Sequence, residues 1–334
     1  MEKKSKILIT GGAGFIGSNL CEYFINEGFN VVCLDNFATG FKHNLDGFIN
    51  APNFQLIEGD IRELEICRLA VQNCDYVLHQ AALGSVPRSI NDPITTNEVN
   101  ISGFLNMLIA SRDEKVKRFI YAASSSTYGD SKSLPKVEDI IGTPQSPYAI
   151  TKYVNELYAQ NFSKLYEMET IGLRYFNVFG KRQDPKGAYA AVIPKFVIQL
   201  VNHESPVING NVEFSRDFTH VDNVVLMNSL AINTTNPEAL NTVFNTAFGE
   251  RTTLLELVNI LKFELGQFDS KINTIETIIG PSRIGDIPHS IASIDKAKLL
   301  LGYNPKTSLK NGISKTIQWY WENLNNQIEK NIVS

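Results

Sequence analysis

Short runs of apolar and β-branched residues alternate with longer segments of helical periodicity through the first half of the chain. The runs are too short for helices, and runs of this kind are typical of strands buried in a parallel sheet. They lie at residues 7–10, 30–34, 54–58, 76–79 and 119–123. Because helical segments separate the strands, the pattern predicts an α/β fold with a doubly wound parallel sheet.

The regular alternation ends about midway along the chain, so the remainder is expected to be organised differently. Residues 1–180 are predicted to form the sheet domain, and residues 181–334 a second, smaller lobe. A strand-like stretch at 242–247 predicts that residues 220–250 return to the sheet, which would interleave the two parts. The last segment, 310–327, has the amphipathic pattern of a helix, and its aromatic side chains are expected to pack rather than react.

Three glycines separate the first predicted strand from the first predicted helix: Gly11, Gly14 and Gly17. Strand, glycine turn and helix are the context that a dinucleotide-binding turn requires. Gly11 would allow a sharp turn, Gly14 would let backbone amides approach a pyrophosphate, and Gly17 would let the helix pack closely on the sheet. The helix N-terminus at Phe15 and Ile16 would add partial positive charge beside the phosphates.

The second predicted strand ends in Asp35, where an acid that binds ribose is expected in such folds. A carboxylate there would repel the extra phosphate of NADP, so the sequence predicts NAD as cofactor. The turn-like segment that follows would touch the adenosine end through Asn36, Phe37 and Gly40.

Ligands of open parallel sheets bind outside the carboxyl ends of the strands. The further residues expected beside the cofactor are Asp60, Ile61, Gln80, Ala81, Ala82 and, on the next helix, Asn100. For Asp60 an alternative is that it caps the helix from Arg62. His79 could act as an acid or base, but its place inside an apolar strand favours a hydrogen-bonded core histidine.

Ser146 and Pro147 are a helix start, with serine as the N-cap and proline at the first helical position. Tyr148 and Lys152 then lie four residues apart, on one face of that helix. The alternative is a tyrosine that packs and a lysine that extends along apolar surface to solvent. A dinucleotide fold and a serine-rich strand end at 124–126 favour a catalytic pair.

A tyrosine with an ordinary pKa of ~10 is a poor base at neutral pH. A nearby ammonium and a positively charged nicotinamide both favour the phenolate. A shift of the pKa to ~7 corresponds to about 4 kcal/mol, which two cationic neighbours in a dry cleft can supply. Tyr148 could then take a proton from a sugar hydroxyl while hydride leaves the same carbon.

Composition excludes several other partners. Charged residues make up 20% of the chain and the net charge is −4, so no nucleic acid is expected. No window approaches 18 uninterrupted apolar residues, so no membrane span is expected. The four cysteines have no metal-ligand spacing and are interpreted as reduced thiols in or near the core. This predicts no metal site and a cytoplasmic location.

The chain resembles the extended short-chain dehydrogenase/reductase superfamily, and within it the NAD-dependent epimerases of sugar nucleotides, including UDP-N-acetylglucosamine 4-epimerases. The residues that carry the resemblance are the glycine turn 11–17, Asp35, 60–61, 124–126, Tyr148, Lys152, 173–178 and 283–286. The resemblance implies a Rossmann domain that binds NAD, a smaller lobe that binds a UDP-sugar, and a homodimer built on paired helices.

The resemblance also assigns roles. Tyr148 would be the base, and Lys152 would lower its pKa and hold the ribose of the cofactor. Ser124 would hydrogen-bond the reacting hydroxyl, with Ser126 as the alternative because three consecutive serines leave the register open. Tyr175 would be a further cofactor contact.

The triplet after the fifth strand distinguishes reactions within the superfamily. Sugar-nucleotide 4,6-dehydratases have Thr-Asp-Glu there, whereas this chain has Ser124-Ser125-Ser126. With no acidic pair available for elimination of water, the resemblance favours epimerisation at carbon 4 of a UDP-hexose. Decarboxylation, uronic acid epimerisation or C6 oxidation of a UDP-sugar are alternatives, as is a non-catalytic protein that senses NAD.

By resemblance, the pocket for the nucleotide sugar is lined by Ser85, Asn177, Val192, Lys195, Asn209, Arg216, Arg283, Asp286 and Ser290. Arginine suits a diphosphate because its planar fork binds two oxygens at once. The alternative for each arginine is a surface ion pair, with Asp217 for Arg216 and with Asp286 for Arg283.

Ser290 occupies the position that faces the substituent on sugar carbon 2 in the epimerases that the chain resembles. A small residue there leaves room for an acetamido group, which predicts interconversion of UDP-N-acetylglucosamine and UDP-N-acetylgalactosamine, with UDP-glucose and UDP-galactose as further substrates. The alternative is that Ser290 only begins a strand-like segment.

Overall fold

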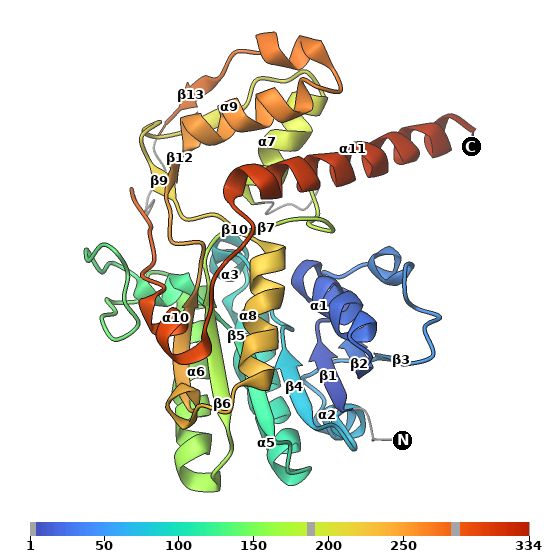
Figure 1. Ribbon diagram of the computed structural model, residues 1–334, viewed down its shortest axis with the longest axis vertical. Helices are drawn as coiled ribbons and strands as arrows, with labels where there is room; N and C mark the ends of the chain where they lie inside the picture. The colour runs from blue at the N-terminus through green and yellow to red at the C-terminus, as the bar shows by residue number, and fades with distance from the viewer. Residues whose placement is uncertain (1–4, 186–190, 282–287, 334) are drawn as a thin grey trace.

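The computed structural model describes residues 5–185, 191–281 and 288–333, and is drawn in Figure 1. Its centre is a seven-stranded sheet of order β11-β6-β5-β4-β1-β2-β3, in which every pair of neighbours is parallel. The strands are β1 (Lys6–Thr10), β2 (Asn30–Asp35), β3 (Phe54–Glu58), β4 (Tyr76–His79), β5 (Arg118–Ser124), β6 (Thr170–Tyr175) and β11 (Thr242–Thr246). The predicted α/β fold is confirmed.

Helices cover both faces of this sheet, which explains why its strands are continuously apolar. The elements on one face are α1 (Phe15–Asn26), α8 (Val221–Asn233) and α10 (Asp295–Leu301); those on the other are α2 (Leu64–Val71), α5 (Phe104–Asp113) and α6 (Pro147–Tyr166). Along β1, Ile7 and Ile9 pack into the first core and Leu8 into the second. Alternate side chains of one strand therefore bury against opposite helix layers.

The parallel register brings the carboxyl ends of the strands to one edge. Hydrogen bonds extend the ladders past the strand ends, because the amide of Gly11 donates to Leu34 (2.8 Å) and that of Gln80 to Thr10 (3.2 Å). Residues that follow different strands in the sequence thereby become neighbours in space.

A third apolar core lies in the smaller lobe, drawn above the sheet in Figure 1. It is built from α7 (Val192–Val201), α9 (Leu254–Leu265) and α11 (Leu309–Val333). Three two-stranded sheets accompany these helices: β7 (Val178–Phe179) with β10 (Thr219–His220), β8 (Val207–Asn209) with β13 (Ile278–Gly280), and β9 (Ser215–Arg216) with β12 (Thr252–Thr253). The buried ring of Tyr320 on α11 packs in this core.

The remaining short elements connect the larger ones. They are η1 (Lys42–Leu45), α3 (Val86–Asn91), α4 (Pro93–Asn97), η2 (Glu98–Gly103), η3 (Ser125–Tyr128), η4 (Pro237–Ala239) and η5 (Ser270–Thr274). Across the described part of the chain, no helix combines the length and apolar character needed to cross a membrane.

Candidate active site

Two glycines of the turn between β1 and α1, Gly11 and Gly17, have no room for a side chain. Gly11 has φ +67°, and a Cβ there would lie 2.8 Å from the backbone nitrogen of Ala81. A Cβ on Gly17 would overlap the carbonyl oxygen of Gly11. The turn therefore keeps its backbone exposed to the cavity beside it, as a pyrophosphate at a helix N-terminus requires.

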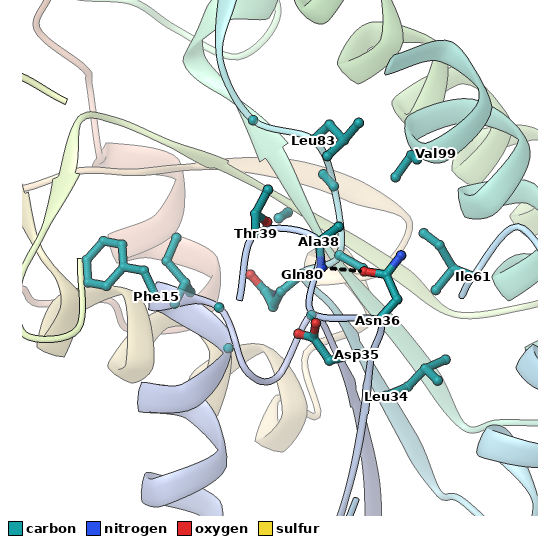
Figure 2. A pocket seen from close by; sticks show the side chains of 18 of the residues that line it. Phe15, Leu34, Asp35, Asn36, Ala38, Thr39, Ile61, Gln80, Leu83 and Val99 are labelled. Carbon is teal, nitrogen blue, oxygen red and sulfur yellow. Dashed lines mark hydrogen bonds between the residues drawn. The ribbon is translucent and has the colours of Figure 1, made fainter. Parts of the chain in front are cut away.

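Asp35 ends β2 beside this turn, and its carboxylate is nearly buried. One oxygen accepts from the amide of Ala13 (2.9 Å) and the other from that of Phe37 (2.8 Å). Burial raises the pKa of Asp35 above its ordinary value, and the two amides act in the opposite direction. The carboxylate, whose side chain is labelled in Figure 2, is thus fixed in place by two backbone donors.

Asp60 is joined to the same corner of the site. Its carboxylate binds Arg62 (2.8 Å) and accepts from the side-chain amide of Asn36 (2.8 Å), and the arginine lowers the pKa of Asp60 to about 2. Helix α2 begins at Leu64 with Glu63 as its N-cap. The alternative role of Asp60 as cap of a helix from Arg62 is therefore wrong, because the helix starts later.

A hydrogen-bonded chain of side chains orients Gln80. Asn228 donates to the Tyr175 hydroxyl (2.9 Å), which donates to Oε1 of Gln80 (3.1 Å). Among the described residues, the buried Nε2 of Gln80 has no acceptor. Because Gln80 and Tyr175 both line the first cavity, this nitrogen is a donor available to a bound cofactor.

The first cavity, of about 500 Å³, collects most of the predicted cofactor contacts (Figure 2). The predicted residues that line it are Gly11, Gly14, Phe15, Ile16, Gly17, Asp35, Asn36, Asp60, Ile61, Gln80, Ala81, Ala82, Tyr148, Lys152 and Tyr175. They come from the ends of five strands, β1, β2, β3, β4 and β6, and from α1 and α6, so the sheet register assembles most of the set. A glycine cradle, a fixed carboxylate and an unpaired amide donor fit a dinucleotide.

Three predicted cofactor residues do not line this cavity. The ring of Phe37 packs against the first core, with the Lys42 ammonium 4.9 Å from its centre. A Cβ on Gly40 would meet the backbone of Ala13. Asn100 is buried and exchanges hydrogen bonds with the backbone of Leu83 (2.8 and 3.2 Å). It therefore fixes a segment of the cavity wall from behind.

Helix α6 carries the predicted catalytic pair. Its start is as predicted, since the Ser146 hydroxyl accepts from the amide of Ala149 (3.1 Å) and Pro147 is the first helical residue. Tyr148 and Lys152 then face the first cavity together. The Lys152 ammonium donates to the carbonyl of Ala122 on β5 (2.7 Å), which fixes the lysine next to the strand that ends in serine.

Burial favours the neutral form of both side chains. It lowers the pKa of Lys152 to about 8, and it raises the pKa of Tyr148, which a hydrogen bond with Ser124 counteracts. The direction for Tyr148 is opposite to the one that a general base needs. Additional positive charge beside the phenol is therefore required for the phenolate to form.

Of the two candidate serines, only Ser124 lines the first cavity. Ser126 lies behind it, and its hydroxyl and amide both donate to the Ser124 hydroxyl (2.9 and 3.1 Å). His79 is buried, is hydrogen-bonded to Thr10 (3.0 Å), and has a pKa lowered by burial to about 3. It is a neutral core histidine.

A second cavity, of about 300 Å³, adjoins the first in the smaller lobe. The predicted substrate residues that line it are Asn177, Val192, Lys195, Asn209 and Arg216. Asn177 lines both cavities, so the two spaces are neighbours. A ligand with a nucleotide part and a sugar part could extend from one into the other.

The other predicted substrate residues are placed differently. Ser85 caps α3 through the amide of Arg88 (3.3 Å) and lines neither cavity. Ser290 also lines neither, and its amide donates to the carbonyl of Ser215 (3.0 Å). Arg283 and Asp286 lie outside the described residues.

Some cavity residues were not predicted, among them Thr39, Leu83 and Arg182. Arg182 pairs with Glu22 on α1 (3.0 Å) and so presents a cation near the glycine turn. In the sequence, the signal available for Arg182 was its place shortly after a strand end, two residues beyond the glycine that follows β7. No group of three or more metal-binding side chains occurs in residues 5–185, 191–281 and 288–333.

Comparisons with known proteins show what the chain is similar to. The chain is 35% identical over 319 residues to a putative UDP-glucose 4-epimerase of Methanocaldococcus jannaschii, covering 95% of this chain and 99% of that one. It superposes with TM-score 0.89 on a UDP-N-acetylglucosamine 4-epimerase from Methanobrevibacter ruminantium in complex with UDP-N-acetylmuramic acid, at 35% identity, covering 96% and 99% of the chains. A UDP-glucose 4-epimerase from Thermotoga maritima with UDP-glucose gives TM-score 0.88 at 35% identity, with the same coverage.

A family profile matches most of the chain, from residue 7 to residue 247. The matched region spans the glycine turn, Asp35, Ser124, Tyr148 and Lys152. The cofactor of this family is NAD, in agreement with the prediction from Asp35. The chain belongs to the NAD dependent epimerase/dehydratase family.

Proposed function

We propose that the protein is an isomerase that inverts carbon 4 of UDP-linked hexoses with NAD as its cofactor. We propose further that it interconverts UDP-N-acetylglucosamine and UDP-N-acetylgalactosamine, and also accepts UDP-glucose and UDP-galactose. One observation carries this: Tyr148, Lys152 and Ser124 line the same cavity as the glycine turn. A proton acceptor, a cation and a hydroxyl donor therefore lie beside the cofactor-binding backbone.

When bound, NAD accepts a hydride from the sugar carbon and returns it. Tyr148 takes the proton from the hydroxyl of the same carbon and later gives it back, as a general base and then acid. Ser124, which hydrogen-bonds Tyr148, holds that hydroxyl. Burial raises the pKa of Tyr148, so the Lys152 ammonium and the positively charged nicotinamide must together favour the phenolate.

Inversion requires that the ketone of the sugar turn over while the nucleotide stays bound. The second cavity supplies a separate place for the nucleotide, with Arg216 as the bidentate partner of the diphosphate. Lys195 and Asn209 line the same cavity and add polar contacts. Anchoring at the diphosphate leaves the sugar free to rotate near Tyr148.

Acceptance of N-acetyl sugars is proposed from the resemblance and from the small size of Ser290, although this residue itself lines neither cavity. Its side chain is small, and its backbone is joined to β9, the strand that carries Arg216. The similarity to a UDP-N-acetylglucosamine 4-epimerase supports this choice of substrate.

The test is incubation of the NAD-bound protein with UDP-N-acetylglucosamine, UDP-glucose and UDP-glucuronate in turn, with products read by NMR. We expect a change of configuration at carbon 4, most readily for the N-acetyl sugar. Loss of the carboxyl carbon of glucuronate, or oxidation at carbon 6, would instead support another reaction of the family. No reaction with any of the three would contradict the proposed activity.

We also expect a homodimer built on paired helices. Exposed apolar side chains lie on α3, α4 and α6, which contact one another: Ile90 is 60% exposed, Ile94 72% and Leu157 47%. Light scattering after gel filtration should give twice the mass of one chain, and Leu157→Glu should give a monomer. A wild-type monomer would contradict this expectation.

A further inference from the structure

Asp217 is a fully buried carboxylate that lines neither cavity. It follows Arg216 directly, at the end of β9. Its two oxygens accept hydrogen bonds from the backbone amides of Phe248 (3.1 Å), Gly249 (3.1 Å) and Ala292 (3.2 Å). A side chain in this position does not touch the ligand, but it joins its own strand to two other segments of the chain.

The segments that Asp217 joins are the two neighbours of β9. Phe248 and Gly249 lead into β12, which pairs antiparallel with β9 on one side. Ala292 follows the stretch 288–290, which bonds to Ser215 of β9 on the other side through two backbone hydrogen bonds of 3.0 Å. The carboxylate therefore fixes both flanks of a strand that is only two residues long.

Two cavity residues depend on this arrangement. The guanidinium of Arg216 donates to the carbonyl oxygens of Ser215 (3.0 Å) and Pro288 (3.2 Å), so its direction follows the position of the flanking stretch. The side-chain amide of Asn177, which lines both cavities, donates to the carbonyl oxygen of Asp217 (3.0 Å). A shift of Asp217 would thus move a cation and an amide of the second cavity together.

We infer that Asp217 is a positioning residue for the diphosphate: it holds Arg216 and Asn177 in the geometry that binds the nucleotide part of the substrate. This inference rests on the proposed function, in which Arg216 contacts the diphosphate. Because the diphosphate is remote from the reacting carbon, its contacts stabilise ground state and transition state alike, so their loss raises KM and leaves kcat nearly unchanged.

The first test is Asp217→Asn, which keeps the volume but turns an NH₂ group toward backbone donors. We expect KM for UDP-N-acetylglucosamine to rise at least tenfold, kcat to stay within about threefold, and bound NAD to be retained. Asp217→Ser, which keeps one acceptor oxygen, should show the same split. Asp269→Asn is the matched control, since this carboxylate of the same lobe binds His203 (2.7 Å) away from both cavities.

The second test is a double-mutant cycle with Arg216→Ala, measuring the Kd of UDP by calorimetry. Because Arg216 is the charged residue of the pair that Asp217 holds, most of the effect should pass through it: Asp217→Asn should weaken UDP binding at least tenfold in the wild type and less than threefold in the Arg216→Ala background. Additive losses would overturn the inference, as would a fall in kcat equal to the rise in KM. Loss of NAD and of the folded state in both Asp217 variants would show a purely structural role and overturn it too.

The same cycle separates this inference from the proposed function. If Arg216→Ala leaves UDP binding unchanged, the diphosphate site has been assigned to the wrong residue, and both statements fail. If Arg216→Ala weakens UDP binding but Asp217→Asn does not, only the role of Asp217 is wrong.

Discussion

In the sheet domain, most residues of the first cavity follow the ends of parallel strands that are four to seven residues long. In the smaller lobe, β9, which carries Arg216, is only two residues long. A long parallel ladder places its strand ends without help from side chains. A two-residue pair cannot do so, and side chains supply the missing constraints. In the smaller lobe, Asp217 supplies them by binding three backbone amides.

This difference has a consequence for substitution. The cofactor side should be most sensitive where the backbone itself is needed, as at the glycine turn. The substrate side should be most sensitive at polar side chains that do not touch the ligand. The catalytic residue Tyr148 on α6 belongs to neither kind, since its role depends on the functional group of its own side chain.

The largest effect is expected at that centre. Tyr148→Phe keeps the ring but removes the ionisable oxygen, so kcat for epimerisation should fall at least ~100-fold, the scale of losing a general base. Turnover is measured by NMR of the product, and bound NAD by absorbance after release. The variant should keep its NAD, because the turn that binds it is untouched. Near-normal turnover would remove Tyr148 from the mechanism.

The next effect tests the backbone side of the comparison. A Cβ on Gly17 would overlap the carbonyl oxygen of Gly11 within the turn, so Gly17→Ala should weaken NAD binding by about 30-fold, or about 2 kcal/mol. Gly47→Ala is the control, because a Cβ at that glycine meets no atom within 4 Å. Equal NAD affinity in the two variants, measured by titration calorimetry, would argue against a cofactor at this turn.

A smaller, selective effect is expected on the substrate side. Ser290 lines neither cavity but adjoins β9, so the longer side chain of Ser290→Tyr is needed to reach the space proposed for the acetamido group. It should lower kcat/KM for UDP-N-acetylglucosamine about tenfold relative to UDP-glucose, the scale of pocket discrimination between similar groups. The ratio of the two activities is the measurement, because it cancels any general loss. An unchanged ratio would leave the specificity unexplained by Ser290.

The sequence predicted the sheet domain well because parallel strands, glycine turns and helix caps leave local signals. The Ser146 cap and the strand ends around Asp35 and Gln80 are of this kind. The role of Asp217 left no such signal, since it depends on amides 31, 32 and 75 residues away. The prediction that Asn100 contacts the cofactor was also wrong, because helical periodicity shows which residues share a face but not what that face contacts.

The last predicted effect concerns one carboxylate from each lobe as the pH changes. Burial raises the pKa of Asp217 to about 7, with Glu250 adding to the rise and three amides opposing it; the buried Tyr303 phenol also faces this carboxylate. In the unfolded chain the pKa is ~3.9. Between these values the folded state holds a proton that the unfolded state has lost, so stability falls as pH rises through this window.

Asp217→Asn removes this titration. The free energy of unfolding of the wild type minus that of the variant should therefore fall by about 1 kcal/mol per pH unit between pH 5 and 7, and level off above pH 7. Urea unfolding at each pH gives this difference, in which groups common to both proteins cancel. Asp60→Asn is the control from the sheet domain: Arg62 lowers the pKa of Asp60 to about 2, so its difference should stay flat over the same range. A flat difference for Asp217 as well would mean that its carboxylate is already ionised at pH 5. The hydrogen bonds from the three amides would then lower the pKa of Asp217 by more than burial raises it. Asp217 and Asp60, one carboxylate from each lobe, would both be ionised over the whole range.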